Sequence, residues 1–333
     1  MTIDVHAHCV PVGVIETLAA ESGRYGIEVA EQDGRYAALI AGRVQTRPIF
    51  PALLDLPRRL AAMDAARVEV QVLSSWIDLT AYALDAEAGS RYARMFNEAL
   101  AATVATAPHR FRALATVPLQ SPVRAADELR HAVGTLGLAG VEIATTVDGI
   151  DLDDQGLEPF WAAAEELRAL VLVHPYASLS GRGVSRYNLN NTVGNPAEST
   201  VAVGHLIFGG VLERHPGLQL CVVHGGGFAP YQLGRWDHAF RHDDRGAATH
   251  LTRPPSHWLR QLHFDTVLHS AAALRYLLDV VGLDRVVLGS DYPFRMGDPE
   301  PVKTVEAVPG LDEADRGKVL RGNLAAVLDG VRR

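Results

Sequence analysis

The segment "DVHAH" near the start of the chain places His6 and His8 one residue apart at the end of a short apolar run. Residues i and i+2 of a β-strand point to the same face, about 6.6 Å apart along the backbone. Two imidazoles on one face at a strand end can converge on one point, as a metal ion requires. An isolated pair of this kind is a chance pair near the N-terminus as often as it is a pair of metal ligands. The residues at the other strand ends therefore decide between these two readings.

Three more side chains with metal-binding chemistry end later apolar runs. His174 ends "LVLVH", His224 ends "CVVH", and Asp291 ends "VVLGSD". Imidazoles together with a carboxylate suit Zn²⁺, and they also suit Mn²⁺ or Fe²⁺. Any one of the 14 histidines is more often a core or surface residue than a ligand. Five such residues at the same end of four strands are hard to place by chance, so the sequence predicts a metal site.

The elements that must position these residues alternate regularly. Eight β-branched runs are expected as strands, at 2–8, 68–75, 111–118, 138–145, 169–175, 218–225, 262–266 and 285–291, and helical spacing recurs between them, as at 92–105, 158–169 and 270–281. This alternation implies right-handed βαβ units and a parallel sheet. Eight units in about 300 residues predict an α/β fold of the (β/α)8 TIM-barrel type, in which all strand ends share one mouth.

The barrel accounts for most of the chain. No linker or low-complexity stretch divides the 333 residues, so a single domain over 1–333 is expected. Three segments exceed the simple repeat, at 9–50, 176–196 and 241–257. The first two follow carboxyl ends of strands, and we therefore expect loop insertions at the C-terminal face that cover a substrate.

The composition of the chain excludes some classes of binding partner. The formal net charge is −8, which argues against nucleic acid. No apolar run reaches membrane-spanning length, and no basic and apolar leader opens the chain, so no membrane partner and a cytoplasmic location are expected. Cys9 and Cys221 form neither a metal-type pair nor a disulfide framework.

The motifs "DVHAH", "LVLVHPY", "VVHGGG" and "LGSDYPF" resemble those of the amidohydrolase superfamily, in its amidohydrolase-2 branch. Within that branch the resemblance is greatest to the aminocarboxymuconate semialdehyde decarboxylase (ACMSD) family. It extends to "RPIFPALLDLPRRLAAMDAARVEVQVLS", "GNPAESTVAVGHLIFGGVLERHPGLQLCVVHGGG" and "LGRWDHAFRH", in order and spacing. The resemblance therefore covers essentially the whole chain.

This resemblance implies that His6, His8, His174 and Asp291 bind one divalent metal, most often zinc, and that no organic cofactor is used. His224 would stand beside a metal-bound water as general acid and base, with a fifth metal ligand as its alternative role. In related aromatic-acid decarboxylases the substrate itself binds the metal and the aspartate at the position of Asp291 helps to protonate the ring. Both routes stay open here.

The lysines support a single metal independently. Binuclear members of the superfamily bridge their two metals with a carboxylated lysine from strand four. The fourth expected strand ends "VEIATT", and the lysines of this chain are Lys303 and Lys318, both far from it. A lysine-bridged metal pair is therefore excluded.

The resemblance also implies substrate-binding residues. Arg47 in "QTRPIF" matches an arginine that binds a substrate carboxylate, and Arg235 in "LGRWDHAF" matches one that reaches the neighbouring site in a homodimer. A guanidinium fork suits bidentate binding of carboxylates. Tyr176 stands where the family has tryptophan, and Tyr187 keeps one aromatic of its lid. Both tyrosines are expected to contact substrate.

Other positions depart from the ACMSD pattern. Asn188 and Asn191 replace apolar side chains of the lid, and Asp243 stands where the family has a further arginine. These changes put the substrate in doubt and leave the expected metal centre intact.

We therefore expect a metal-dependent, cofactor-free decarboxylase of a small unsaturated or aromatic carboxylic acid. A hydrolase or hydratase on the same scaffold, for example one that opens a lactone, is the alternative. A non-enzymatic barrel with a structural metal is a third reading. Release of CO₂ separates the first two, since both would bind carboxylates.

Overall fold

Eight parallel strands form the centre of the computed structural model, which describes residues 2–32, 35–176, 184–243 and 245–332. The strands are β1 (Ile3–His8), β5 (Val70–Ser74), β6 (Phe111–Ala113), β7 (Gly140–Ala144), β10 (Leu170–His174), β11 (Gln219–Val222), β12 (His263–Asp265) and β13 (Val286–Val287). All eight fall within the expected runs. The third and eighth strands are shorter than expected.

The strands close into a barrel through two seams. Backbone pairing gives two parallel sheets, in the orders β1-β5-β6 and β13-β12-β11-β10-β7. A parallel bridge between Ala115 and Val141 joins β6 to β7, and another between Ala7 and Tyr292 joins β1 to the segment after β13. The expected (β/α)8 barrel is confirmed.

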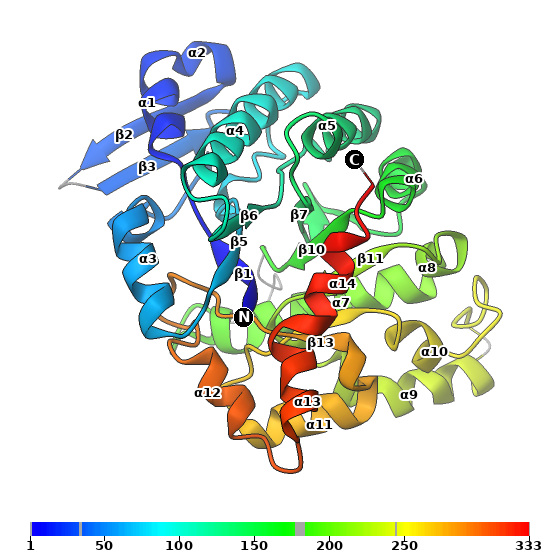
Figure 1. Cartoon of the computed structure of the whole chain (residues 1–333). Coiled ribbons are helices and arrows are strands. Elements are labelled where there is room, and N and C mark those ends of the chain that lie inside the picture. The colour runs from blue at the N-terminus through cyan, green and yellow to red at the C-terminus, as the bar shows by residue number, and fades with distance from the viewer. Residues whose placement is uncertain (1, 33–34, 177–183, 244, 333) are drawn as a thin grey trace.

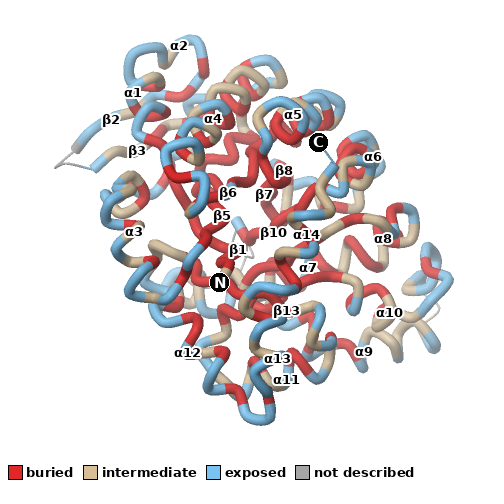
Figure 2. The backbone as a smooth tube through the Cα atoms, viewed as in Figure 1, coloured by how far each residue is buried: buried red, intermediate tan, exposed pale blue. Residues whose placement is uncertain are grey.

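Helices surround this barrel and connect its strands (Figure 1). They are α3 (Leu56–Ala65), α4 (Ala86–Thr106), α5 (Pro122–Gly134), α6 (Glu158–Leu167), α7 (Asn195–Phe208), α8 (Val211–Arg214), α9 (Ala229–His242), α10 (Pro255–Leu259), α11 (Ala271–Val281), α12 (Pro301–Glu306), α13 (Glu313–Gly317) and α14 (Asn323–Asp329). Figure 2 shows buried residues along the central strands and exposed residues on the outer sides of the helices. Among the described residues, none of these helices has the length and apolar character needed to cross a membrane.

Local sequence explains where several helices begin. The carboxylate of Asp85 accepts hydrogen bonds from the first-turn amides of Glu87 and Ala88 in α4. The carboxylate of Asp55 accepts one from Arg58 in α3. Such caps satisfy amides that have no partner within the helix.

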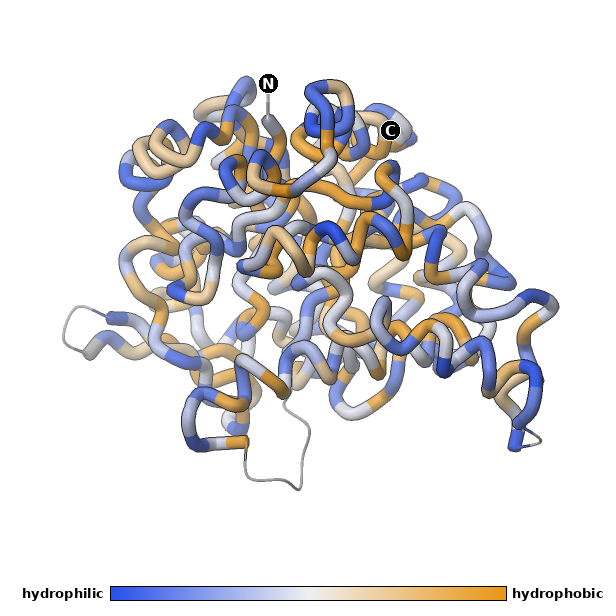
Figure 3. The backbone as a smooth tube through the Cα atoms, turned by 90° about the horizontal axis from the view of Figure 1, so that it is seen from below, coloured by the Kyte–Doolittle hydropathy of each residue, from blue (hydrophilic) through white to orange (hydrophobic). Residues whose placement is uncertain are grey.

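The last helix closes the amino-terminal end of the barrel. Leu324 and Val327 of α14 belong to the same apolar cluster as the barrel residues Val5, Val72 and Leu172. Both termini lie at one end of the molecule, as Figure 3 shows. The strands begin at this end, so the mouth of the barrel at their carboxyl ends stays free for a site.

The segment at 9–50 is more ordered than the sequence analysis expected. It contains α1 (Val12–Ala20), α2 (Ser22–Tyr25) and an antiparallel sheet of β2 (Ile27–Gln32), β3 (Arg35–Ile40) and β4 (Val44–Gln45). A second small hairpin, β8 (Thr146–Val147) and β9 (Ile150–Asp151), follows β7. The expected substrate-covering role of 176–196 falls partly outside the described residues, because 177–183 are not among them.

Candidate metal centre and its cavity

A bulge in the first strand aims both of its histidines at the barrel mouth. The register against β5 shifts between Asp4 and Ala7, so that Val5 and His6 lie opposite the single residue Val72. Val5 consequently packs in the barrel interior, while His6 and His8 both reach the same cluster above it. A bulge redirects side chains in this way and is common beside functional sites.

Four buried side chains converge at the mouth: His6, His8, His174 and Asp291. Their ligand atoms all lie within 4.8 Å of one another. The Nε2 atoms of His6 and His8 are 3.1 Å apart, and Oδ1 of Asp291 lies 3.3 and 3.4 Å from them. Two nitrogens at about 2.1 Å from one ion are separated by about this distance. The four side chains that the sequence analysis predicted as ligands therefore come together.

The other ring nitrogen of each histidine meets an acceptor. Nδ1 of His6 lies 2.7 Å from Oδ2 of Asp265, and Nδ1 of His174 lies 2.8 Å from the carbonyl of Pro175. Nδ1 of His8 lies 2.9 Å from the carbonyl of Ser75. These acceptors place the proton on Nδ1 and leave each Nε2 with a lone pair aimed at the common point, the arrangement of metal-binding histidines.

The aspartate of the cluster is held as an anion. Burial raises the pKa of Asp291, but the imidazoles of His6 and His224 lower it by more than burial raises it. The net pKa of Asp291 therefore lies well below the usual range. Its Oδ1 is buried and has no hydrogen-bond partner in the part of the chain that the structure describes. A buried, unpartnered carboxylate oxygen among imidazole lone pairs calls for a cation, so the residues fit a divalent metal.

His224 stands beside this cluster in a strained backbone. Its Nε2 is 3.7 Å from Oδ2 of Asp291, and its φ is +54°. Burial lowers the pKa of His224, whereas Asp291 raises it, and the net shift is upward.

The next residues, Gly225 to Gly227, also have positive φ. A Cβ on Gly227 would lie 2.0 Å from the carbonyl oxygen of Pro196, so only glycine lets α7 approach this closely.

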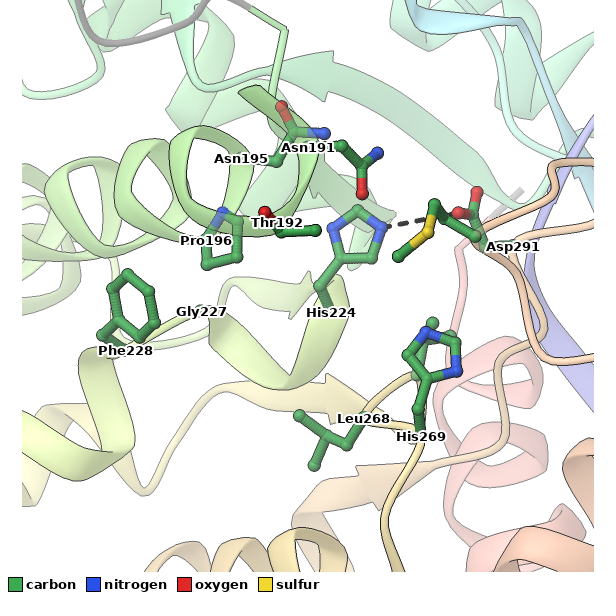
Figure 4. Close-up of a pocket in the computed structure, with 12 residues that line it drawn as sticks. Asn191, Thr192, Asn195, Pro196, His224, Gly227, Phe228, Leu268, His269 and Asp291 are labelled. Carbon is green, nitrogen blue, oxygen red and sulfur yellow. Dashed lines mark ion pairs between the residues drawn. The ribbon is translucent and has the colours of Figure 1, made fainter. Parts of the chain in front are cut away.

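A cavity with two lobes opens at the cluster. Lobes of about 600 and 290 Å³ share Asn191, Asn195, His224, Asp291 and Met296 among their lining residues. In the smaller lobe the imidazole of His224 lies below Asn191, and a dashed line marks its ion pair with Asp291 (Figure 4).

The larger lobe combines rings and cations. It is lined by Phe50, Trp76, Phe294 and three arginines, Arg35, Arg47 and Arg295. A flat, negatively charged molecule therefore matches its walls.

Arg47 enters the larger lobe already paired. Its Nε and Nη2 donate to the two carboxylate oxygens of Asp78, at 2.9 and 2.5 Å, and its guanidinium lies over the ring of Trp76. Asp78 is buried, so this bidentate bond fixes the arginine in one orientation. Nη1 makes none of these bonds, and among the described residues no hydrogen-bond partner is seen for it.

The other predicted substrate contacts do not line this cavity. Tyr187 is 81% exposed, and Tyr176 lines a separate small hollow beside Thr80 and Tyr82. Arg235 is an exposed residue of α9. Their roles in substrate binding stay predictions. Asp243 pairs with Arg245 and is likewise absent from the lining.

Sequence reasoning missed the buried polar network beneath the metal centre. Asp4 accepts from the side chains of Gln71 and Ser290, and Arg59 donates to Gln71 and to the carbonyl of His8. Arg59 is 1% exposed, whereas arginines are mostly surface residues, so its burial could not be expected from the sequence alone. The aspartate of "DVHAH" was the available signal, since it precedes both histidines.

The amidohydrolase family model Amidohydro_2 matches residues 3–330. The chain therefore belongs to the amidohydrolase family, as its motifs indicated.

Similar proteins cover nearly the whole chain. It is 32% identical over 324 residues to 2-amino-3-carboxymuconate-6-semialdehyde decarboxylase of Dictyostelium discoideum, which covers 97% of this chain and 90% of that protein. The structure of 5-carboxyvanillate decarboxylase from Sphingomonas paucimobilis matches with a TM-score of 0.82 and 28% identity over 98% of both chains. A dihydroxybenzoic acid decarboxylase from Polaromonas, solved with bound manganese and the inhibitor 2-nitroresorcinol, matches with a TM-score of 0.80 and 24% identity over 98% of this chain and 96% of that one.

Proposed function

We propose that this protein is a metal-dependent, cofactor-free carboxy-lyase that decarboxylates a small unsaturated or aromatic carboxylic acid. The observation that carries the proposal is the convergence of three imidazole Nε2 atoms and one unpartnered carboxylate oxygen at the floor of a cavity walled by aromatic rings and arginines. The similar proteins named above are decarboxylases, which supports loss of CO₂ over other chemistries of this fold.

His6, His8, His174 and Asp291 would hold one divalent ion per chain, which acts as a Lewis acid and stabilises negative charge that develops on the substrate. Zinc is the ion that we propose first. Manganese, which the Polaromonas structure contains, suits the same imidazole and carboxylate donors.

The remaining residues bind the acid and move protons. The free Nη1 of Arg47 would hold a carboxylate, while Phe50 and Phe294 pack against the unsaturated or aromatic part. Cleavage of the C–C bond releases CO₂ and leaves the bonding electron pair on the substrate carbon. The imidazole of His224 then delivers a proton to that carbon from Nε2, and Asp291 beside it favours the protonated ring before transfer.

A screen tests the reaction directly. Metal-reconstituted protein is mixed with a panel of hydroxy-, amino- and nitro-substituted benzoates and muconate-type acids, and CO₂ release is measured together with the ultraviolet change. We expect CO₂ from at least one acid, and none from protein stripped of metal by a chelator. Absence of CO₂ from the whole panel with one metal bound per chain would contradict the proposal.

A substitution tests the role of His224. His224→Ala should abolish turnover while metal content stays near that of the wild type, because the imidazole acts beside the metal in this proposal. Loss of metal in the variant would instead identify His224 as a ligand. His109→Ala, at an exposed position, serves as the matched control and should change neither quantity.

We further propose a single domain that acts as a cytoplasmic homodimer, in which Arg235 reaches the site of the partner subunit. Arg235 is exposed and lies apart from the cavity of its own chain, which fits such a role.

The alternative is hydrolysis or hydration of a lactone on the same scaffold. It is favoured by one observation, that His224 lies within reach of the metal cluster as a base for water. Turnover of a compound from a panel of lactones, without release of CO₂, would support this alternative.

A further inference from the structure

We propose that Asn191 and Asn195, together with His269, form a hydrogen-bonding subsite in the smaller lobe that selects substrates with a further uncharged polar substituent. The substrate then occupies both lobes, and its reacting carboxylate lies at the metal centre, which the two lobes share through Asp291. The inference rests on the proposed decarboxylase function and specifies which additional group the acid carries.

The smaller lobe holds three polar side chains with unused hydrogen-bonding capacity. Asn191, Asn195 and His269 line it, and none of the three forms a side-chain hydrogen bond or ion pair with another described residue. Each carboxamide offers two N–H donors and an acceptor oxygen. Apolar side chains such as Pro196 and Leu268 form other parts of the wall. A few polar groups in a largely apolar pocket fix the orientation of a bound small molecule.

The charge of the smaller lobe differs from that of the larger one. Among the described residues no arginine or lysine lines the smaller lobe, and its one carboxylate, that of Asp291, belongs to the metal centre. An anionic substituent would therefore lose hydration there without gaining a cation. The lobe favours an uncharged group that hydrogen-bonds, such as a hydroxyl or amino group.

A π-helical turn and the start of α7 carry the two asparagines. The turn spans Asn190–Gly194 and α7 begins at Asn195, so the two asparagine side chains lie about one turn apart and both reach the lobe. The amide of Phe228 donates to Oγ1 of Thr200 in α7, at 2.8 Å, which fixes this helix against the loop after His224. The carboxamides are therefore positioned relative to the metal centre before a ligand binds. Such π-helical turns are frequent at functional sites.

His269 reaches the same lobe from the segment after β12. Its φ is +54°, and it directly precedes Ser270, whose side chain caps α11. In the view of Figure 4 its imidazole lies below His224, whereas Asn191 and Asn195 lie above that residue. The polar groups of the lobe thus come from two separate elements, and a substituent that contacts them lies close to His224.

Calorimetric binding to the metal-reconstituted full chain tests the subsite without requiring turnover. The probes are 3- and 4-hydroxybenzoate, each compared with the methylbenzoate of the same substitution pattern, which is similar in size and cannot hydrogen-bond. A hydroxyl replaces the hydrogen bonds of the water that it displaces, whereas a methyl group does not. At one ring position or both, wild-type protein should bind the hydroxy acid about tenfold more tightly, the effect of one or two neutral hydrogen bonds.

Substitutions assign this preference to the lobe. Asn191→Leu and Asn195→Leu should each lower it, because leucine keeps the bulk of asparagine without its polar atoms, and the double variant should bring it close to one. His269→Leu should lower it as well. Asn190→Leu is the matched control, since this exposed asparagine belongs to the same turn but lines neither lobe, and it should keep the wild-type preference.

Several outcomes would overturn the subsite. They are a preference that the double variant leaves unchanged, no preference in the wild type at either ring position, and no binding of any probe. Metal content and circular dichroism show whether the variants are folded, which we expect because neither carboxamide has a partner to lose among the described residues.

Failure of the subsite and failure of the proposed reaction are distinguishable. If the preference holds while no acid releases CO₂, the proposed reaction is overturned and the subsite stands. If an acid releases CO₂ while the variants leave the preference unchanged, the subsite is overturned and the reaction stands.

Discussion

Three residues that line the cavity have a strained backbone. His224, His269 and Asp291 all line it, and all have φ between +54° and +57°. Such conformations are costly for residues other than glycine and persist where surrounding contacts over-determine them. His224 is followed by glycines packed under α7, and the amide of Asp291 donates to the carbonyl of His6. The fold thus holds these side chains in orientations that an unconstrained strand end would not adopt.

Asp265 is predicted to act through His6. Its Oδ2 accepts from Nδ1 of His6, while its Oδ1 accepts from the amides of Gly225 and Val267. Asp265→Asn removes the charge that keeps the imidazole oriented and basic, so the affinity for metal should fall about 10- to 100-fold. Competition with a chelator measures it. Asp329→Asn on α14 should leave metal affinity unchanged, and equal affinity in both variants would contradict the role.

The two ends of the barrel have different roles, one in stability and the other in chemistry. The amino-terminal end of the barrel is filled by apolar side chains and covered by α14, whereas the mouth carries polar groups. The bulge in β1 marks the boundary between the two, since Val5 packs below it and His6 points above it. Chemistry can therefore vary at the mouth without loss of the core below.

A substitution at Leu324 tests whether the amino-terminal end of the barrel serves stability alone. The residue is 1% exposed in the apolar cluster of the barrel. Leu324→Ala should lower the free energy of unfolding by about 2 to 5 kcal/mol, since it leaves a cavity in a packed core. Denaturant titration measures the loss, and Val123→Ala at a 62% exposed position is the control. The turnover of the folded variant should match the wild type, and reduced turnover would mean that α14 also shapes the mouth.

At the scale of the whole molecule, buried ionisable groups link stability to pH. His263 of β12 is 5% exposed, and its Nδ1 has no hydrogen-bond partner among the described residues. Burial, and then the charge of Arg285, lowers its pKa to about 4. The folded protein thus keeps this imidazole neutral where the unfolded chain would protonate it.

The sign of the pH effect follows. Below pH 6.5 the unfolded state binds the proton of His263 and the folded state does not, so stability falls as the pH drops toward 4. The full loss is about 3 kcal/mol. His263→Gln should remove this part of the pH dependence, and chemical denaturation of both proteins between pH 7 and 4 measures it. His109→Gln is the surface control, and identical curves for wild type and His263→Gln would refute the assignment.

The proposed homodimer makes a prediction for mixed chains. Arg47→Ala and Arg235→Ala should each have low activity alone, because every site lacks one arginine. A mixed dimer contains one site with both arginines, so an exchanged equal mixture should recover roughly a quarter of wild-type activity. Activity after mild dissociation and reassociation measures this, and the absence of any recovery would count against a shared site.

Much of this molecule was predictable from local patterns. The positions of all eight strands follow from short β-branched runs, and the four metal-binding candidates were found because each one ends such a run or follows it closely. Asp265 likewise ends a short apolar run, "LHFD", and its carboxylate contacts Nδ1 of His6. The antiparallel sheet at 27–45 was missed, because its strands are partly exposed and lack a clear alternation of apolar and polar residues.

The sequence by itself thus determined which donor atoms reach the barrel mouth, because strand period and chain order carry that information locally. Only the tertiary structure decided how those donors are oriented and paired. The pairing of β1 with β5 around its bulge and the bond between Arg47 and Asp78 join residues from 31 to 67 positions apart. Such contacts depend on how elements pack against one another, and no local pattern of side chains specifies that packing.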